Sequence, residues 1–127
     1  MASANDLVIK ETSKTPGINF SRGLLKMSGR SIPEDGIVFY QPVMMWIEEY
    51  IKSPEPLTRL DFRLEYINSG SNRFVFNILK SFEECHKSGG SVIVNWYYEE
   101  DDDTIKNLGK DFASLLEIPF KLVETVG

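Results

Sequence analysis

The sequence contains one cysteine and one histidine among its 127 residues. A single cysteine excludes an internal disulfide and a cysteine-ligated zinc site. A single histidine excludes most of the usual catalytic and metal-binding sites, which combine histidine with cysteine or with further histidines. Cys85 and His86 are neighbours in a predicted helix, so their side chains point about 100° apart and cannot form a nucleophile–base pair. We therefore expect a buried Cys85, a surface His86 and a protein that is not an enzyme.

Basic residues are also few. The chain has 14 Lys and Arg against 19 Asp and Glu, which gives a net charge of −5. Binding a polyphosphate requires a surplus of positive charge, so nucleic acid is not an expected partner. Residues 1–63 hold eight basic and eight acidic residues, whereas residues 64–127 hold six and eleven. The second half therefore carries the whole negative charge.

Long apolar segments and nucleotide-binding motifs are absent from the sequence. Residues 1–14 are polar, unlike a secretory signal, and no segment approaches the roughly 18 apolar residues that cross a bilayer. The glycines match neither the phosphate-binding loop nor the dinucleotide-binding pattern. We expect a cytoplasmic protein with no membrane insertion and no cofactor.

The length and composition fit one globular domain, residues 1–127. Apolar periodicity predicts the element order β-β-β-α-β-α-β-α-β. Strand–helix–strand crossovers require parallel neighbours, so we predict an α/β domain with a mixed sheet. The predicted strands are residues 7–9, 18–20, 24–27, 58–67, 91–98 and 120–123, and the predicted helices are about residues 41–51, 71–87 and 102–116.

Alternation along the strand at residues 58–67 predicts which face of the sheet is buried. A period of two places the apolar side chains on one face and the charged side chains on the other. Helices on both faces would not tolerate three charges there, so we expect about three helices packed mainly on one face. The apolar residues are Leu60, Phe62, Leu64 and Tyr66, and the charged residues are Asp61, Arg63 and Glu65.

Two features bear on the start of the first helix. Residues 28–30 (Ser-Gly-Arg) should end the preceding strand, and Ser31 with Glu34 has the form of a capping box. Pro42 disrupts helical hydrogen bonding, so we expect either a kink there or a main helix that begins near residue 41.

An acidic run, Glu-Glu-Asp-Asp-Asp, occupies residues 99–103. It lacks the alternating ligands and central glycine of a calcium loop, and it precedes a helix that should begin near Asp102. We interpret the run as helix capping and solubility, because negative side chains stabilise a helix N-terminus. The alternatives are an acidic patch facing a partner and a carboxylate-based, metal-dependent enzyme.

The turn after residues 58–67 contains Asn68, Ser69, Gly70, Ser71 and Asn72. Small polar residues cap helices, and that role alone explains them. A hydroxyl there would also be a suitable phosphoacceptor, because a phosphate would meet the free N–H groups at the positive end of the next helix. Local chemistry does not decide between two alternatives. Ser69 is either a site of regulatory phosphorylation or only the helix cap of a constitutive interaction domain.

Five short segments, taken in order, resemble the SiaC family of bacterial regulatory phosphoproteins. The resemblance covers about residues 7–124, nearly all of the chain. The segments are Thr15-Pro16, Ser31-Ile-Pro33-Glu34, Trp46-Ile-Glu-Glu-Tyr50, Phe62-Arg-Leu-Glu-Tyr66-Ile-Asn68-Ser69, and Val94-Asn-Trp96-Tyr-Tyr98 followed by acids.

This resemblance implies a fold like that of the STAS-type anti-sigma-factor antagonists and a function in partner switching. A cognate serine/threonine kinase would phosphorylate the turn, and a PP2C-type phosphatase would restore the hydroxyl. The unphosphorylated form would bind an effector such as a diguanylate cyclase. By position the acceptor is Ser69, where serine replaces the family's usual threonine; Gly70 replaces a serine, and the retained Ser71 is a rival acceptor.

A protein that switches partners would also need surfaces beyond the turn on which a partner docks. The exposed face of the sheet and the acidic run are candidate secondary docking surfaces, although both have an ordinary explanation as solvated surface. The sheet-face candidates are Asp61, Arg63, Glu65, Asn95 and Tyr97.

Overall fold

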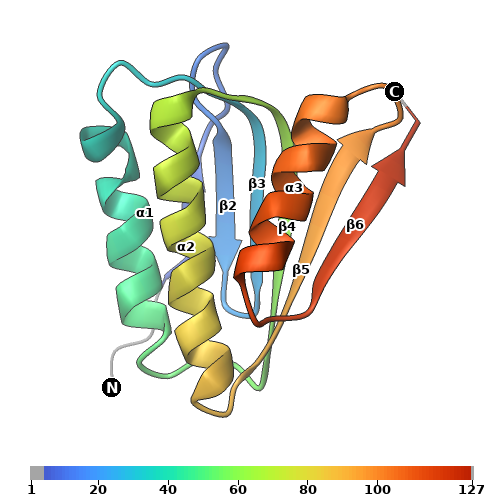
Figure 1. Ribbon diagram of the computed structural model, residues 1–127. Helices are drawn as coiled ribbons and strands as arrows, with labels where there is room; N and C mark the ends of the chain where they lie inside the picture. The colour runs from blue at the N-terminus through green and yellow to red at the C-terminus, as the bar shows by residue number, and fades with distance from the viewer. Residues whose placement is uncertain (1–4, 127) are drawn as a thin grey trace.

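A computed structural model of the chain describes residues 5–126 (Figure 1). The first four residues of the polar start, and Gly127 at the end of the expected domain, lie outside this range. The described residues follow the predicted order β-β-β-α-β-α-β-α-β. The elements are β1 (Leu7–Ile9), β2 (Gly17–Ser21), β3 (Leu24–Ser31), α1 (Gly36–Tyr50), β4 (Leu57–Ile67), α2 (Ser69–Lys87), β5 (Ser91–Glu99), α3 (Asp103–Leu115) and β6 (Phe120–Thr125).

The strands form one mixed sheet in the order β1-β2-β3-β4-β5-β6. Strands β1, β2 and β3 are antiparallel neighbours, whereas β3, β4, β5 and β6 are parallel neighbours. The helices α1, α2 and α3 lie side by side on one face of this sheet (Figure 1). The predicted α/β class, mixed sheet and one-sided helix layer are therefore confirmed. Each helix follows a parallel strand, so all three helices begin at the same edge of the sheet.

Helix α1 packs its predicted apolar face into the core, with Val43, Trp46, Ile47 and Tyr50 buried. The helix is continuous from residue 36 to residue 50, so a main helix that begins only near residue 41 is wrong. Pro42 is exposed, and the carbonyl that loses its N–H partner belongs to Val38, a residue that is 63% exposed.

Strand β3 is longer than predicted, and this changes the start of α1. Gly29 adopts a left-handed φ of 94°, and the pairing with β4 shifts register between Gly29 and Arg30. Glycine permits this irregularity, so the strand continues to Ser31 and residues 28–30 do not end it. The N-cap of α1 is Asp35, whose carboxylate accepts a hydrogen bond from the Val38 N–H at 3.2 Å. The predicted capping box at Ser31 and Glu34 is therefore wrong.

The predicted alternation in β4 holds at Leu60, Phe62 and Leu64, which are buried. Tyr66 is wrongly assigned to the buried face, because 51% of it is exposed at the end of the strand, beyond the register shift. Asp61 also departs from the prediction. It lies on the face without helices, but Arg59 and Asn95 cover its carboxylate and donate hydrogen bonds to it at 2.9 Å.

Substituting Asp61 with asparagine should destabilise the fold in a pH-dependent way. Burial alone would raise the pKa of Asp61, but the hydrogen bonds from Arg59 and Asn95 outweigh it and leave the pKa below its usual value. The stability from ionised Asp61 is therefore complete above the unfolded pKa of about 3.9 and is lost as pH falls through the lower folded pKa. We expect Asp61→Asn to lower the free energy of unfolding by about 1–2 kcal/mol at neutral pH.

Urea denaturation at about pH 7 and about pH 3 measures this difference, which should narrow at the lower pH. Glu65→Gln is the matched control, because exposed Glu65 has only a long ion pair with Arg30 at 3.9 Å. Its effect should stay within about 0.5 kcal/mol. If Asp61→Asn lowered the free energy of unfolding equally at both pH values, ionised Asp61 would not be the source of the stability.

The single cysteine and histidine pack near the end of α2. Cys85 is buried as predicted, and burial raises the pKa of its thiol. His86 is only partly exposed, and its Nδ1 accepts a hydrogen bond from the Val92 N–H at 3.3 Å. Its predicted surface position is thus corrected, because the imidazole connects α2 to β5.

Candidate regulatory site

The turn between β4 and α2 is fixed by Asn68. This residue is the N-cap of α2, with an extended backbone (φ −76°, ψ 167°), and its side-chain Oδ1 accepts a hydrogen bond from the Ser71 N–H at 2.8 Å. Its own N–H donates to the Ser31 carbonyl at 3.1 Å, which joins the turn to the end of β3. The start of α2 is therefore held to two neighbouring strands.

Ser69 is the first residue of α2 and is exposed. The first N–H groups of a helix have no partner inside the helix, and they form its positive end. The first turn of α2 contains no acidic residue, and the exposed Arg73 follows one turn later. A negative group on the Ser69 hydroxyl would therefore meet hydrogen-bond donors and positive charge.

Gly70 is exposed and has no left-handed backbone angle. Apart from its chain neighbours and the backbone of its own helix, the atom nearest to a Cβ built on it would be Oδ1 of Asn68, at 3.8 Å. The turn therefore does not require glycine, and a serine at this position would fit the same backbone.

Ser71 is buried, in contrast to Ser69, and is 2% exposed. The Ser31 hydroxyl donates a hydrogen bond to Ser71 Oγ at 2.8 Å, and the Tyr40 hydroxyl lies 2.6 Å from Ser31 Oγ. Because Ser31 has one proton, Tyr40 is the donor to Ser31. Burial raises the pKa of Tyr40 to about 12, which keeps that proton in place. The three hydroxyls form a buried chain that links α1, β3 and α2.

Asn72 faces a groove between the start of α2 and helix α3, which we call the turn groove. Its backbone N–H donates to the Asn68 carbonyl at 3.2 Å. Its side-chain Oδ1 is buried and has no hydrogen-bond partner among residues 5–126. The residues lining the turn groove include Tyr66, Asn72, Asp102, Leu108 and Asp111.

The five residues of the predicted site thus lie in one turn but differ in burial: Ser69 and Gly70 are exposed, whereas Ser71 is buried. Sequence reasoning did not find the buried hydroxyl chain, because Ser31 and Tyr40 are distant from Ser71 in the sequence. Only the repeated presence of small hydroxyl residues at the predicted ends of elements could have indicated it.

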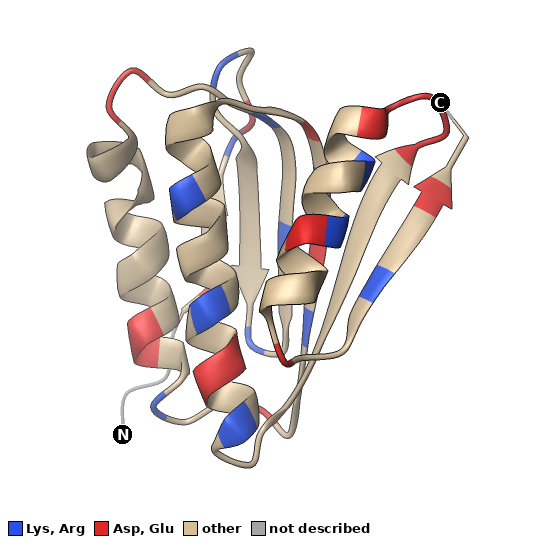
Figure 2. Ribbon diagram, in the orientation of Figure 1, with Lys and Arg blue, Asp and Glu red and all other residues tan. Residues whose placement is uncertain are grey.

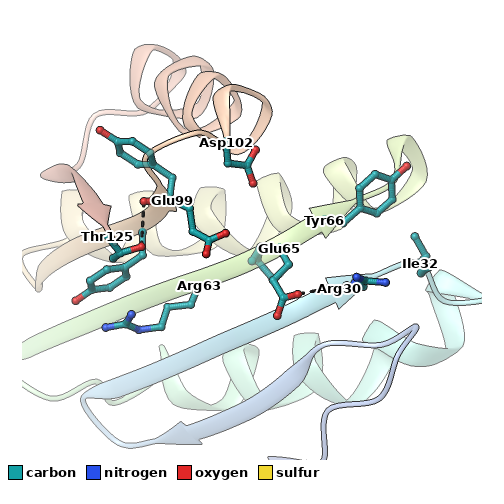
Figure 3. A pocket seen from close by; sticks show the side chains of 11 residues that line it. Arg30, Ile32, Arg63, Glu65, Tyr66, Glu99, Asp102 and Thr125 are labelled. Atoms are coloured by element: carbon teal, nitrogen blue, oxygen red, sulfur yellow. Dashed lines mark hydrogen bonds and ion pairs between the residues drawn. The ribbon is translucent and has the colours of Figure 1, made fainter. Parts of the chain in front are cut away.

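A second groove lies on the face of the sheet without helices (Figure 3). The Arg63 guanidinium lies 3.8 Å from the centre of the Tyr97 ring, and Arg30 forms the long ion pair with Glu65. Glu99 and Asp102 lie on the side of this groove away from Arg30 (Figure 3). Of the predicted sheet-face candidates, Arg63, Glu65 and Tyr97 line this groove, whereas Asp61 and Asn95 bond to each other outside it.

The acidic run has the predicted capping role at one residue. Asp102 is the N-cap of α3, and its carboxylate accepts a hydrogen bond from the Ile105 N–H at 3.0 Å. Within residues 5–126, no three His, Cys, Asp or Glu side chains are grouped closely enough to hold a metal ion. None of the helices in this same range is both long and apolar enough to span a membrane.

Comparisons with known proteins identify a family and a relative. The model of the SiaC family of regulatory phosphoproteins matches residues 9–125. An uncharacterised protein of Pseudomonas aeruginosa strain UCBPP-PA14 is 31% identical over 120 residues, which cover 93% of this chain and 95% of that protein.

Solved structures show the same relationship. SiaC of Pseudomonas aeruginosa is 30% identical, with a TM-score of 0.88 over 95% of this chain and 99% of SiaC. A crystal structure of the diguanylate cyclase SiaD with its activator SiaC, from the same organism, matches with a TM-score of 0.88 and 30% identity, over 94% of this chain and 100% of the matched chain. The family expected from the sequence is confirmed: the chain belongs to the SiaC family of regulatory phosphoproteins.

Proposed function

We propose that this protein is a non-catalytic, cytoplasmic switch controlled by phosphorylation of Ser69. A serine/threonine kinase would add the phosphate and a PP2C-type phosphatase would remove it. The unphosphorylated form would bind and regulate an effector, for which a diguanylate cyclase is the strongest candidate because the similar SiaC is the activator of one.

The single observation that carries the proposal is the contrast between the two serines of the turn. Ser69 is exposed at the positive end of α2, whereas Ser71 is buried in the hydroxyl chain. A kinase must reach the hydroxyl that it modifies, and phosphorylating Ser71 would require the chain and the helix start to open. This favours Ser69 as the acceptor.

The alternative of a constitutive interaction domain makes Ser69 a helix cap. The N-cap of α2 is instead Asn68, whose side-chain Oδ1 accepts a hydrogen bond from the Ser71 N–H. Ser69 is thus not the cap of α2, which favours a regulatory role over a capping role. The alternative of a carboxylate-based metal enzyme has no supporting group of ligands among the described residues.

The measurement that tests the proposal is the intact mass of the protein purified from its own cells. We expect a fraction of the wild type to be heavier by one phosphate, and Ser69→Ala to lack this form. Ser71→Ala is the matched control, and it should keep the phosphate if it folds, which circular dichroism checks. A phosphorylated form that persists in Ser69→Ala, or its absence from the wild type under all growth conditions, would refute the proposal.

A further inference from the structure

The outward face of α1 has no charge over most of its length. Residues 36–47 contain no Asp, Glu, Lys or Arg, and helix α1 is correspondingly tan in Figure 2 until Glu48 and Glu49. Helices on the surface of a soluble domain normally carry charged residues on the outer face. Helix α2 follows this rule, with exposed Arg73, Lys80 and others (Figure 2).

Three large apolar side chains protrude from this face of α1. Ile37 is 74% exposed, Val38 63% and Met45 61%. At about 100° per residue, all three lie on the same side of the helix, opposite the buried Trp46 and Ile47. We call Ile37, Val38 and Met45 the α1 patch. Scattered exposed apolar residues need no explanation, but a cluster on one uncharged helix face is typical of an interaction surface.

The α1 patch adjoins the proposed switch. Helices α1 and α2 begin at the same edge of the sheet (Figure 1). Gly36 lies against Phe74 of α2 so closely that a Cβ on it would be 2.7 Å from the Phe74 ring, and the Tyr40 and Phe74 rings stack at 4.8 Å. The start of α1, where Ile37 follows Gly36, therefore packs against the second turn of α2, and Ser69 lies in the turn before it.

Carboxylates bound the patch at both ends. Exposed Glu34 and Asp35 precede α1, and Glu48 and Glu49 follow the patch. Lys52 pairs with Glu49 at 2.9 Å, whereas Glu48 has no ion pair among the described residues. If two copies of this chain packed patch against patch, acidic ends would face acidic ends in either direction. Like charges facing each other are costly, so a second copy is a poor occupant.

We propose that the α1 patch binds an amphipathic helix of the effector whose apolar face is bounded by Lys or Arg at both ends. The apolar residues would cover Ile37, Val38 and Met45, and the basic residues would meet the carboxylates at each end. The identification of the occupant as the effector rests on the proposed function. The proposal adds the surface and the chemistry of the partner segment.

Photo-crosslinking in the protein's own cells tests this inference. Benzoylphenylalanine replaces Met45 in a Ser69→Ala background, and mass spectrometry identifies the crosslinked peptide. The matched control carries the same group at exposed Lys110 on α3. We expect position 45, but not position 110, to crosslink to an apolar helical segment flanked by Lys or Arg. A crosslink to a second copy of this chain, or to a segment without those basic residues, would overturn the inference. So would a yield at position 45 no higher than the yield at position 110.

Substitutions provide a quantitative check on the same complex. The measurement is how much of the partner identified by crosslinking is captured by a Ser69→Ala bait without the crosslinker. Adding Met45→Glu to this bait should reduce the captured amount by about tenfold or more, because a charge would be buried in the apolar contact. Met45→Leu should retain it, and the exposed position should leave the melting temperature of both variants unchanged. Equal recovery with Met45→Glu would overturn the inference. If recovery is instead equal for Ser69→Ala and Ser69→Glu baits, the switch fails while the docking surface stands.

Discussion

Ser69→Glu is expected to bind the effector about tenfold more weakly than Ser69→Ala, a difference of about 1.4 kcal/mol. The hydroxyl lies at the start of α2, where free N–H groups and Arg73 attract a negative charge. A partner that covers this end must then desolvate the charge, which costs free energy unless the partner supplies donors of its own. Glutamate has a single charge, so the phosphate itself should have the larger effect.

Quantitative affinity capture from the protein's own cells measures this effect, with the two Ser69 variants as baits. The matched control is Ser91→Glu, which adds the same charge at another exposed serine. Ser91 begins β5, so it lies at the edge of the sheet opposite the start of α2. The Ser91→Glu variant should bind the effector as strongly as the wild type does. Identical partner lists and amounts for Ser69→Ala and Ser69→Glu would exclude partner switching at this residue.

The order of the elements could be predicted because local patterns determined it. Alternation at Leu60, Phe62 and Leu64 requires a sheet with one buried face, and Val43, Trp46, Ile47 and Tyr50 require a helix packed on one side. Each of these patterns uses residues close together in the sequence. The mixed sheet followed from the need of strand–helix–strand units for parallel neighbours.

The errors arose where distant residues determine the structure. Ser31 has the spacing of a helix cap, but β3 continues through Gly29 and places its hydroxyl beside Ser71, forty residues away. Asp61 has the alternation of a solvated residue, but Arg59 and Asn95 enclose it. Side-chain burial on a sheet depends on strands that pair only in the folded chain, so sequence periodicity cannot determine it.

The candidate site was predictable in position but not in detail. The turn at residues 68–72 follows from the end of an alternating strand and the start of a helix. The difference between Ser69 and Ser71 does not follow, since both are small hydroxyl residues in one turn. Two residues of a helix turn the side chain by about 200°, which places one serine toward solvent and the other against Ser31.

Gly109→Ala is expected to destabilise the fold, against the preference of helices for alanine. Gly109 lies in the middle of α3, where alanine would ordinarily gain about 1 kcal/mol. Here a Cβ would be 2.4 Å from Cδ1 of the Trp96 indole and 2.8 Å from the Leu122 side chain. Trp96 is fully buried, and its Nε1 donates to the Ile105 carbonyl of α3 at 2.9 Å. Helix α3 cannot move outward without weakening this hydrogen bond.

The clash should therefore exceed the gain in propensity, and we expect a net loss of about 1–3 kcal/mol in the free energy of unfolding. Urea denaturation measures it, and the melting temperature should fall by about 3–5 °C per kcal/mol. Gly70→Ala is the matched control, because it adds the same methyl group to a helix where, apart from the chain neighbours and the helix backbone, the nearest atom is 3.8 Å away. It should raise stability by about 0.4–1 kcal/mol. If Gly109→Ala were as stable as Gly70→Ala, the close packing of α3 on Trp96 would be wrong.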